Sequence, residues 1–79
     1  MKITLKLIAT YRQLLPEDTR GNTIELEISP GVTPTQVLSE FNVPIDESSV
    51  IVVNGHVPVE GQVLMDGDKV SAFPALAGG

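Results

Sequence analysis

The chain has 79 residues, a net charge of −5 at pH 7 and no cysteine. This length suffices for one small domain, whose core leaves little interior room for a substrate pocket. The absence of cysteine excludes disulfides and thiolate metal sites. The excess of acidic side chains disfavours a nucleic-acid partner, and it either favours a protein partner with a basic face or serves only to keep a small cytosolic protein soluble.

Residues 2–7 and 23–28 are predicted to form the first two strands. In both segments apolar residues occupy every second position, which is the period of a half-buried strand. Between them, Leu14 and Leu15 predict a single helical turn before Pro16. Because the first segment alternates in polarity, it does not resemble a signal peptide, and no stretch of the sequence is long and apolar enough to span a membrane. We therefore expect a cytoplasmic protein with no membrane partner.

A helix of about two to three turns is predicted to begin at Thr33. Thr33 and Gln36 have the spacing of a capping box, and Pro34 occupies the first helical position, where its missing N–H costs nothing. Asn42 tolerates the left-handed conformation that ends a helix, and Pro44 cannot continue one. One face of this helix carries the apolar residues Val37, Leu38 and Phe41. This face is expected to pack against the sheet.

A third strand is predicted in the β-branched run "SSVIVV", residues 48–53, which is closed by the hairpin-forming Asn-Gly pair at 54–55. A short strand is predicted after this turn, and the Asp-Gly pair at 66–67 is predicted to form a second turn that leads into the last strand. The order of strand, strand, helix, strand, short strand and strand predicts a two-layer α+β domain over residues 1–74. In it, one main helix covers one face of a mixed sheet, and the other face is open.

Three polar groups are candidates for chemistry within this domain, and each has a simpler interpretation. His56 follows the Asn-Gly turn without a carboxylate or serine in a catalytic pattern, so we interpret it as an exposed turn residue. Residues 66–68 lack the alternating ligands of a calcium loop and are interpreted as a turn. Glu25 and Glu27 share one strand face, where solvated carboxylates are expected. No metal site is predicted.

The tail, residues 75–79, ends in two glycines. A terminal carboxylate is ionised at neutral pH, with a pKa of about 3.5, and is a poor electrophile until it is activated. Conversion to a mixed anhydride with a nucleotide would let a sulfur or amine nucleophile take the acyl group. Glycine lets the backbone enter a narrow channel, and Pro74 keeps the residue before it extended, so the tail is expected to project from the last strand. The alternative is that residues 75–79 are a frayed chain end.

The hairpin, the single helix, the turns in "IVVNGHVP" and "MDGDKVSAFP", and the terminal "AGG" together resemble the ubiquitin-like sulfur carriers of the MoaD/ThiS type over the whole chain. The resemblance is closest to the small subunit of molybdopterin synthase (MoaD), and it implies the ubiquitin-like β-grasp fold. Two departures concern the tail and its docking patch. Ala72 stands where those subunits often have a second aromatic residue, and Ala75 where they often have a second proline, which implies a smaller docking patch and a less stiff tail.

The resemblance also implies a reaction at Gly79. A ubiquitin-activating-type adenylyltransferase would adenylate its carboxylate with ATP and magnesium, and a persulfide sulfur donor would convert it to a covalent thiocarboxylate. The molybdopterin synthase large subunit would then receive the sulfur for molybdenum cofactor biosynthesis, so the chain would be a non-catalytic, sulfur-donating subunit that binds no cofactor itself. Gly78 and Ala77 would belong to the tail, and Phe73 and Pro74 to the docking surface.

Other functions fit the same residues. The chain could carry sulfur for thiamine thiazole synthesis, it could be a ubiquitin-like modifier joined to lysine by an isopeptide bond, or it could be an interaction module with an inert tail. Docking in each case needs an apolar surface. The run "VIVV" at residues 50–53 supplies one candidate, because consecutive strand residues face both sides of the sheet and the open side has no predicted cover. The alternative is that this run is a central strand capped by loops.

Overall fold

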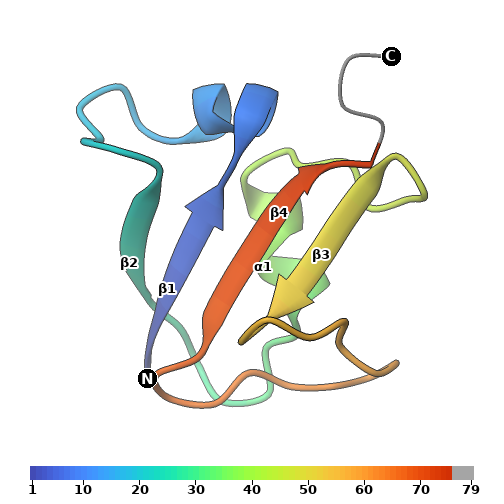
Figure 1. Cartoon of the computed structure of the whole chain (residues 1–79). Helices are drawn as coiled ribbons and strands as arrows, with labels where there is room; N and C mark the ends of the chain where they lie inside the picture. The colour runs from blue at the N-terminus through green and yellow to red at the C-terminus, as the bar shows by residue number, and fades with distance from the viewer. Residues whose placement is uncertain (76–79) are drawn as a thin grey trace.

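In residues 1–75, which the computed structural model describes, four strands form one mixed sheet with the order β2-β1-β4-β3 (Figure 1). The strands are β1 (Lys2–Leu7), β2 (Thr23–Glu27), β3 (Ser49–Val53) and β4 (Lys69–Pro74). The central pair, β1 and β4, is parallel, and each edge strand is antiparallel to its neighbour. Residues 76–79 are not described. The β1 and β4 strands end, and β3 begins, at one rim of the sheet, at the top of Figure 1.

The helix α1 (Pro34–Glu40) begins at the predicted capping box. The Gln36 amide donates to Thr33 Oγ1 (3.3 Å), and the Thr33 amide donates to Gln36 Oε1 (2.9 Å), so two otherwise unpaired donors are satisfied. Beyond the helix, Asn42 has a φ of +65°, the left-handed conformation expected of a terminator. The predicted start and end of the helix are therefore confirmed.

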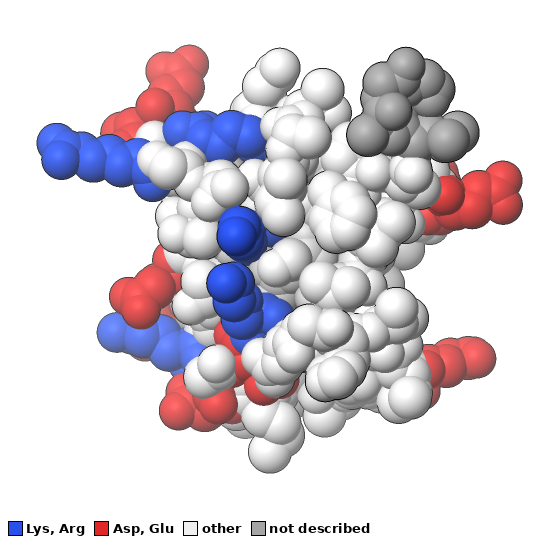
Figure 2. Space-filling view, in the orientation of Figure 1, with Lys and Arg blue, Asp and Glu red and all other residues white. Residues whose placement is uncertain are grey.

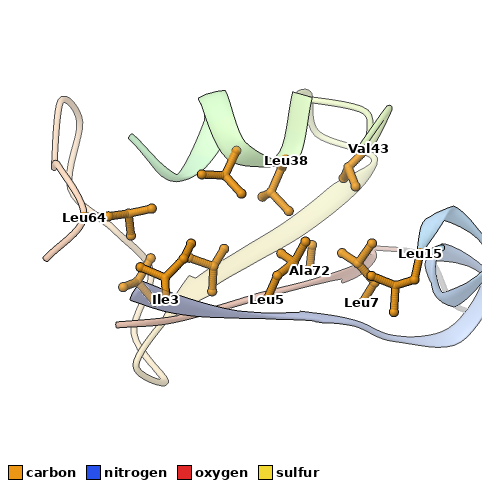
Figure 3. Close-up of a cluster of buried hydrophobic side chains, with 11 residues drawn as sticks. Ile3, Leu5, Leu7, Leu15, Leu38, Val43, Leu64 and Ala72 are labelled. Atoms are coloured by element: carbon orange, nitrogen blue, oxygen red, sulfur yellow. The ribbon is translucent and has the colours of Figure 1, made fainter. Parts of the chain in front are cut away.

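The core lies between α1 and one face of the sheet (Figure 3). Leu38 points from the helix toward β1, where Leu5 and Leu7 face it, and all three side chains are fully buried. The loops close the two ends of this layer with Leu15 and Leu64. The remaining buried apolar residues of the core are Ile3, Val37, Val43, Val53, Val70 and Ala72. One helix over one face of a mixed sheet confirms the predicted α+β architecture.

The connection between β1 and β2 contains a 3-10 helix, η1 (Ala9–Leu14). Leu15 follows it directly and is buried, so the predicted turn before Pro16 exists but is longer than Leu14 and Leu15 alone indicate. The Ile8 amide donates to the Ala72 carbonyl (3.1 Å), which places the start of this connection beside β4.

The short strand predicted after the Asn-Gly turn is wrong for the described residues, because only an isolated bridge joins Val53 and His56 there. Pro58 has no amide hydrogen with which to extend a ladder. The chain instead runs over the surface, with Val57 and Val59 76% and 71% exposed. It returns to the core at Leu64, whose amide donates to the Val32 carbonyl (2.8 Å).

Side-chain hydrogen bonds join the Asn-Gly turn after β3 to the Asp-Gly turn before β4. Asn54 Nδ2 donates to Asp68 Oδ1 (2.9 Å), and Asn54 Oδ1 accepts from the Lys69 amide (2.9 Å). The Met65 amide donates to Asp68 Oδ2 (2.9 Å). Asn54 has a φ of +53°, a left-handed conformation that asparagine tolerates better than most residues. Two motifs that look independent in the sequence therefore form one connection.

Substitution of Asn54 tests this connection. In Asn54→Ala both side-chain bonds are lost and a less tolerant residue occupies the left-handed conformation, so we expect the free energy of unfolding to fall by about 2 kcal/mol. Asn54→Gly loses the same bonds but adopts a positive φ freely, so its expected loss is roughly half as large. Urea denaturation of both variants measures the difference. Equal stabilities of the two variants would contradict the backbone contribution.

Candidate functional site

The sheet face opposite α1 carries an apolar area on the side of β3 and basic side chains near its middle, on β1 and β4 (Figure 2). By the strand register, Val50 and Val52 of β3 lie on this open face with Phe73 of β4, and each is half-buried. Lys2, Lys6 and Lys69 lie on the same face. Figure 2 shows Lys and Arg atoms near its middle and an uncharged area beside them.

Glu25 and Glu27 of the edge strand β2 lie on this face too, opposite Thr4 and Lys2, so the positive charge is confined to the two central strands beside the apolar area. The excess of acidic residues predicts a partner with a basic face, but the lysines beside the apolar area favour an acidic one here. The prediction of an apolar open surface is confirmed, because alternate residues of "VIVV" face outward. The other two, Ile51 and Val53, pack against the core.

Phe73 and Pro74 do not share a surface. Phe73 is opposite Val50 on the open face, whereas Pro74 is opposite Ser49 on the side that α1 covers. Antiparallel pairs alternate between hydrogen-bonded and non-hydrogen-bonded, and the bond from the Ala75 amide to the Ser48 carbonyl (2.8 Å) puts Pro74 in a non-hydrogen-bonded pair. The amide hydrogen that Pro74 lacks is thus not needed by β3, and of the two residues only Phe73 can contact a partner on the open face.

Ala72 lies in the core and not in the docking patch. It is fully buried on the helix side of β4, opposite Ile51. The expectation that a small residue here reduces the docking patch is therefore wrong, since a larger side chain would point at α1. Ala72 instead sets how closely the sheet and the helix layer can pack.

Ala75 defines the root of the tail. Its amide extends the β3–β4 register by one residue through the bond to Ser48, at the rim where β3 begins. The predicted site residues Ala77, Gly78 and Gly79 lie outside the described residues. The described part of the site is consequently the open face and this root.

A turn at residues 46–48 supports the root and was not predicted. Asp46 Oδ1 accepts from the Ser48 amide (2.8 Å) and from the Ser48 hydroxyl. Tyr11 Oη lies 2.6 Å from Ser49 Oγ, in the next residue along. The Asp-x-Ser spacing is typical of an Asx turn and could have indicated the first contact, but Tyr11 is too distant in the sequence for any local signal.

Hydrogen bonds from the Ser48 hydroxyl, and then from its amide, lower the pKa of Asp46 below the ordinary value for an aspartate. The folded-state pKa is below that of the unfolded chain, so the turn is complete above the ordinary pKa and is lost as the pH falls through the folded-state value. Ser48→Ala removes the larger of the two causes. We expect it to raise the pKa of Asp46, measured by an NMR titration of the carboxyl carbon, and an unchanged midpoint would contradict the hydroxyl contact.

The other polar candidates have structural explanations. His56 is exposed, and Asp66 accepts from the Lys2 amide (2.8 Å) as part of the turn before β4. Glu27 lies 3.6 Å from the amino-terminal nitrogen with its side chain 74% exposed. Residues 1–75 contain no group of three or more His, Cys, Asp or Glu side chains that could hold a metal ion. Over the same residues, no helix has the length and hydropathy that crossing a bilayer requires.

Two solved structures resemble this fold over nearly the whole chain. SAMP1 from Haloferax volcanii matches with a TM-score of 0.75 and 16% identity, covering 100% of both chains. A structure of H. volcanii small archaeal modifier protein 1 matches with a TM-score of 0.73 and 15% identity, covering 95% of this chain and 98% of the other. At these identities the likeness shows the fold alone, and it confirms the predicted ubiquitin-like β-grasp.

No curated protein matches the chain. A family model does, and it covers almost every residue, the open face and the root of the tail included. Because the model described as Mut7-C ubiquitin matches residues 1–78, the chain belongs to this ubiquitin-like family.

Proposed function

We propose that this chain is a ubiquitin-like sulfur carrier whose Gly79 carboxylate is adenylated and converted to a thiocarboxylate. The observation that carries the proposal is the match of a ubiquitin family over residues 1–78 in a sequence whose residues 78 and 79 are both glycine. The reaction needs a free carboxylate on Gly79, so the proposal concerns the form of the chain in which Gly79 is the last residue.

The chemistry would proceed in balanced steps on partner enzymes. The carboxylate attacks the α-phosphate of magnesium-bound ATP, which forms the acyl adenylate and releases pyrophosphate. The outer sulfur of a persulfide then attacks the acyl carbon, and AMP leaves. A thiol cleaves the resulting acyl disulfide, which leaves the sulfur on Gly79 as a thiocarboxylate and forms a disulfide between the thiol and the donor.

The domain would contribute a surface on which the partner enzyme docks and a fixed starting point for the tail. The apolar side chains of Val50, Val52 and Phe73 support docking through burial of apolar area, and the neighbouring lysines favour a partner with an acidic rim. The hydrogen bond from Ala75 to Ser48 supports a tail that starts from a fixed point on the sheet rim.

Intact mass spectrometry tests this function. The chain is incubated with a ubiquitin-activating-type adenylyltransferase from the same organism, ATP, magnesium, a persulfide donor and a thiol. We expect a product heavier by the difference between one sulfur atom and one oxygen atom, and none when ATP is omitted. An unchanged mass together with no release of pyrophosphate would overturn the proposal.

A second candidate function is protein modification, in which a lysine amine takes the activated acyl group and forms an isopeptide bond. It is favoured by one observation, that a structurally similar protein is named a small archaeal modifier protein. Denaturing gels of cell extract would then show ATP-dependent ladders carrying this chain. Thiocarboxylate without ladders would favour the carrier.

The pathway that receives the sulfur is the finer part of the proposal. The resemblance favours the small-subunit role in molybdopterin synthase, with thiamine thiazole synthesis as the alternative. The two roles predict different partners. Co-elution with a synthase large subunit would support the first role, and co-elution with a thiazole-forming enzyme the second.

A further inference from the structure

We propose that Tyr11 and Asp46 are positioning residues that fix the direction in which the tail leaves the domain, acting through Ser48 and Ser49 on Ala75. We name these five residues the tail-root clamp. The inference rests on the proposed function, because direction matters only if the end of the tail reacts. It adds to that function the residues of the domain that aim the reacting group.

The first half of the clamp is the Asx turn around Asp46. Its carboxylate accepts from the Ser48 amide and hydroxyl, and its carbonyl accepts from the Ser49 amide (3.2 Å). These bonds fix the backbone at Ser48, whose carbonyl then accepts from the Ala75 amide (2.8 Å). Ala75 is therefore bonded to Ser48, a residue whose own position is fixed by its bonds to Asp46 and by the bond from the next residue to Asp46.

The second half is Tyr11, which reaches from η1 to the first residue of β3. Its ring packs against the core, and its Oη lies 2.6 Å from Ser49 Oγ and 3.4 Å from the Ser48 carbonyl oxygen. The shorter contact is a strong hydrogen bond, and the longer one adds little. Tyr11 therefore ties the start of β3 to η1 at the rim from which the tail departs.

The direction of the backbone at Ala75 has a large effect on the position of the Gly79 carboxylate because few residues separate the two. The four steps from Ala75 to Gly79 span at most ~14 Å of extended chain. Pro74 fixes its own φ next to the clamp, so little rotation is available at the root while Ala75 is held. When the hydrogen bond of Ala75 is broken, the backbone at Ala75 can adopt more conformations. Each added conformation lowers the fraction of time that the Gly79 carboxylate is aligned for attack.

Two substitutions remove the two halves separately. Tyr11→Phe deletes the hydroxyl and keeps the ring in the core, and Asp46→Ala deletes the Asx turn. Glu47→Ala is the matched control, because it removes the same charge one residue along the chain without removing the acceptor of Ser48. All three should unfold at temperatures close to that of the wild type, since the contacts of Asp46 are exposed and Tyr11→Phe removes one partly buried hydrogen bond while keeping the ring in place.

The direct measurement is hydrogen exchange of the Ala75 amide by NMR. We expect exchange about 10-fold faster in Tyr11→Phe and Asp46→Ala, and unchanged in Glu47→Ala. This readout needs no activity and does not depend on the proposed reaction. Unchanged exchange in both clamp variants would overturn the clamp.

The kinetic measurement uses the full chain and the adenylyltransferase. We expect kcat for acyl-adenylate formation to fall about 10-fold in the clamp variants while KM for the chain stays constant, since misplaced groups lower the rate without weakening docking. A rise in KM alone, or an unchanged kcat with faster Ala75 exchange, would overturn the positioning role. A wild-type chain that is never adenylated would instead overturn the proposed function, and the exchange result would still decide whether the clamp exists.

Discussion

Deletion of Gly79 is expected to abolish the mass increase that marks the thiocarboxylate. The shortened chain ends in the Gly78 carboxylate, so the chain that can carry the reacting group is shorter by one residue, at most ~3.5 Å when extended. Misplacement of a reacting group by 1 Å can lower a rate on the order of 100-fold, so a carboxylate that cannot reach the α-phosphate is expected to lose more than 100-fold in adenylation. The measurement is pyrophosphate release at saturating ATP, followed by intact mass.

An extension is the counterpart of the deletion. One alanine added after Gly79 keeps every residue of the chain but moves the free carboxylate one residue past the position that the proposed reaction uses, and we expect the same loss of rate. Gly78→Ala keeps the length and adds a Cβ that a narrow channel must accommodate, so its rate should fall about 10-fold with the thermal stability unchanged. If the extended chain reacted at the wild-type rate, Gly79 could not be the reacting residue.

Local sequence signals were sufficient for most of the fold. The Thr33–Gln36 capping box and the terminator at Asn42 depend on contacts within a few residues, and both are formed as predicted. The alternation in the first two strands likewise reflects burial on one face, because Leu5 is opposite Ile24 and both contribute to the core. Such patterns predict these features because the residues that interact lie close together in the sequence.

One of the two errors arose where distant contacts decide the outcome. The strand expected after the Asn-Gly turn fails because Asn54 bonds to Asp68 and Lys69, which directs the chain toward the last strand instead of into a longer hairpin. The error at Ala72 has a local cause. Successive strand residues face opposite sides of a sheet, so Ala72 and Phe73 cannot both lie on the open face, and Ala72 pairs with Ile51 on the side that α1 covers.

Leu38→Ala is expected to lower the free energy of unfolding by about 3 kcal/mol, within the range measured for truncated buried leucines. Leu38 is fully buried, and it is the helix residue that faces β1 across the core (Figure 3). A domain of this size has a total stability of roughly 4–12 kcal/mol, so the cavity removes a large part of it. Urea denaturation should show a lower midpoint at an unchanged slope.

Val57→Ala is the matched control, because Val57 is also aliphatic but is 76% exposed, and its truncation should change the stability by less than about 0.5 kcal/mol. The pair also separates folding from chemistry. Leu38→Ala should lose thiocarboxylate formation only in proportion to the unfolded fraction, whereas the Gly79 deletion should lose it while fully folded. Equal destabilisation by the two truncations would contradict the position of the core between α1 and the sheet, and with it the assignment of the opposite face as the one free to dock a partner.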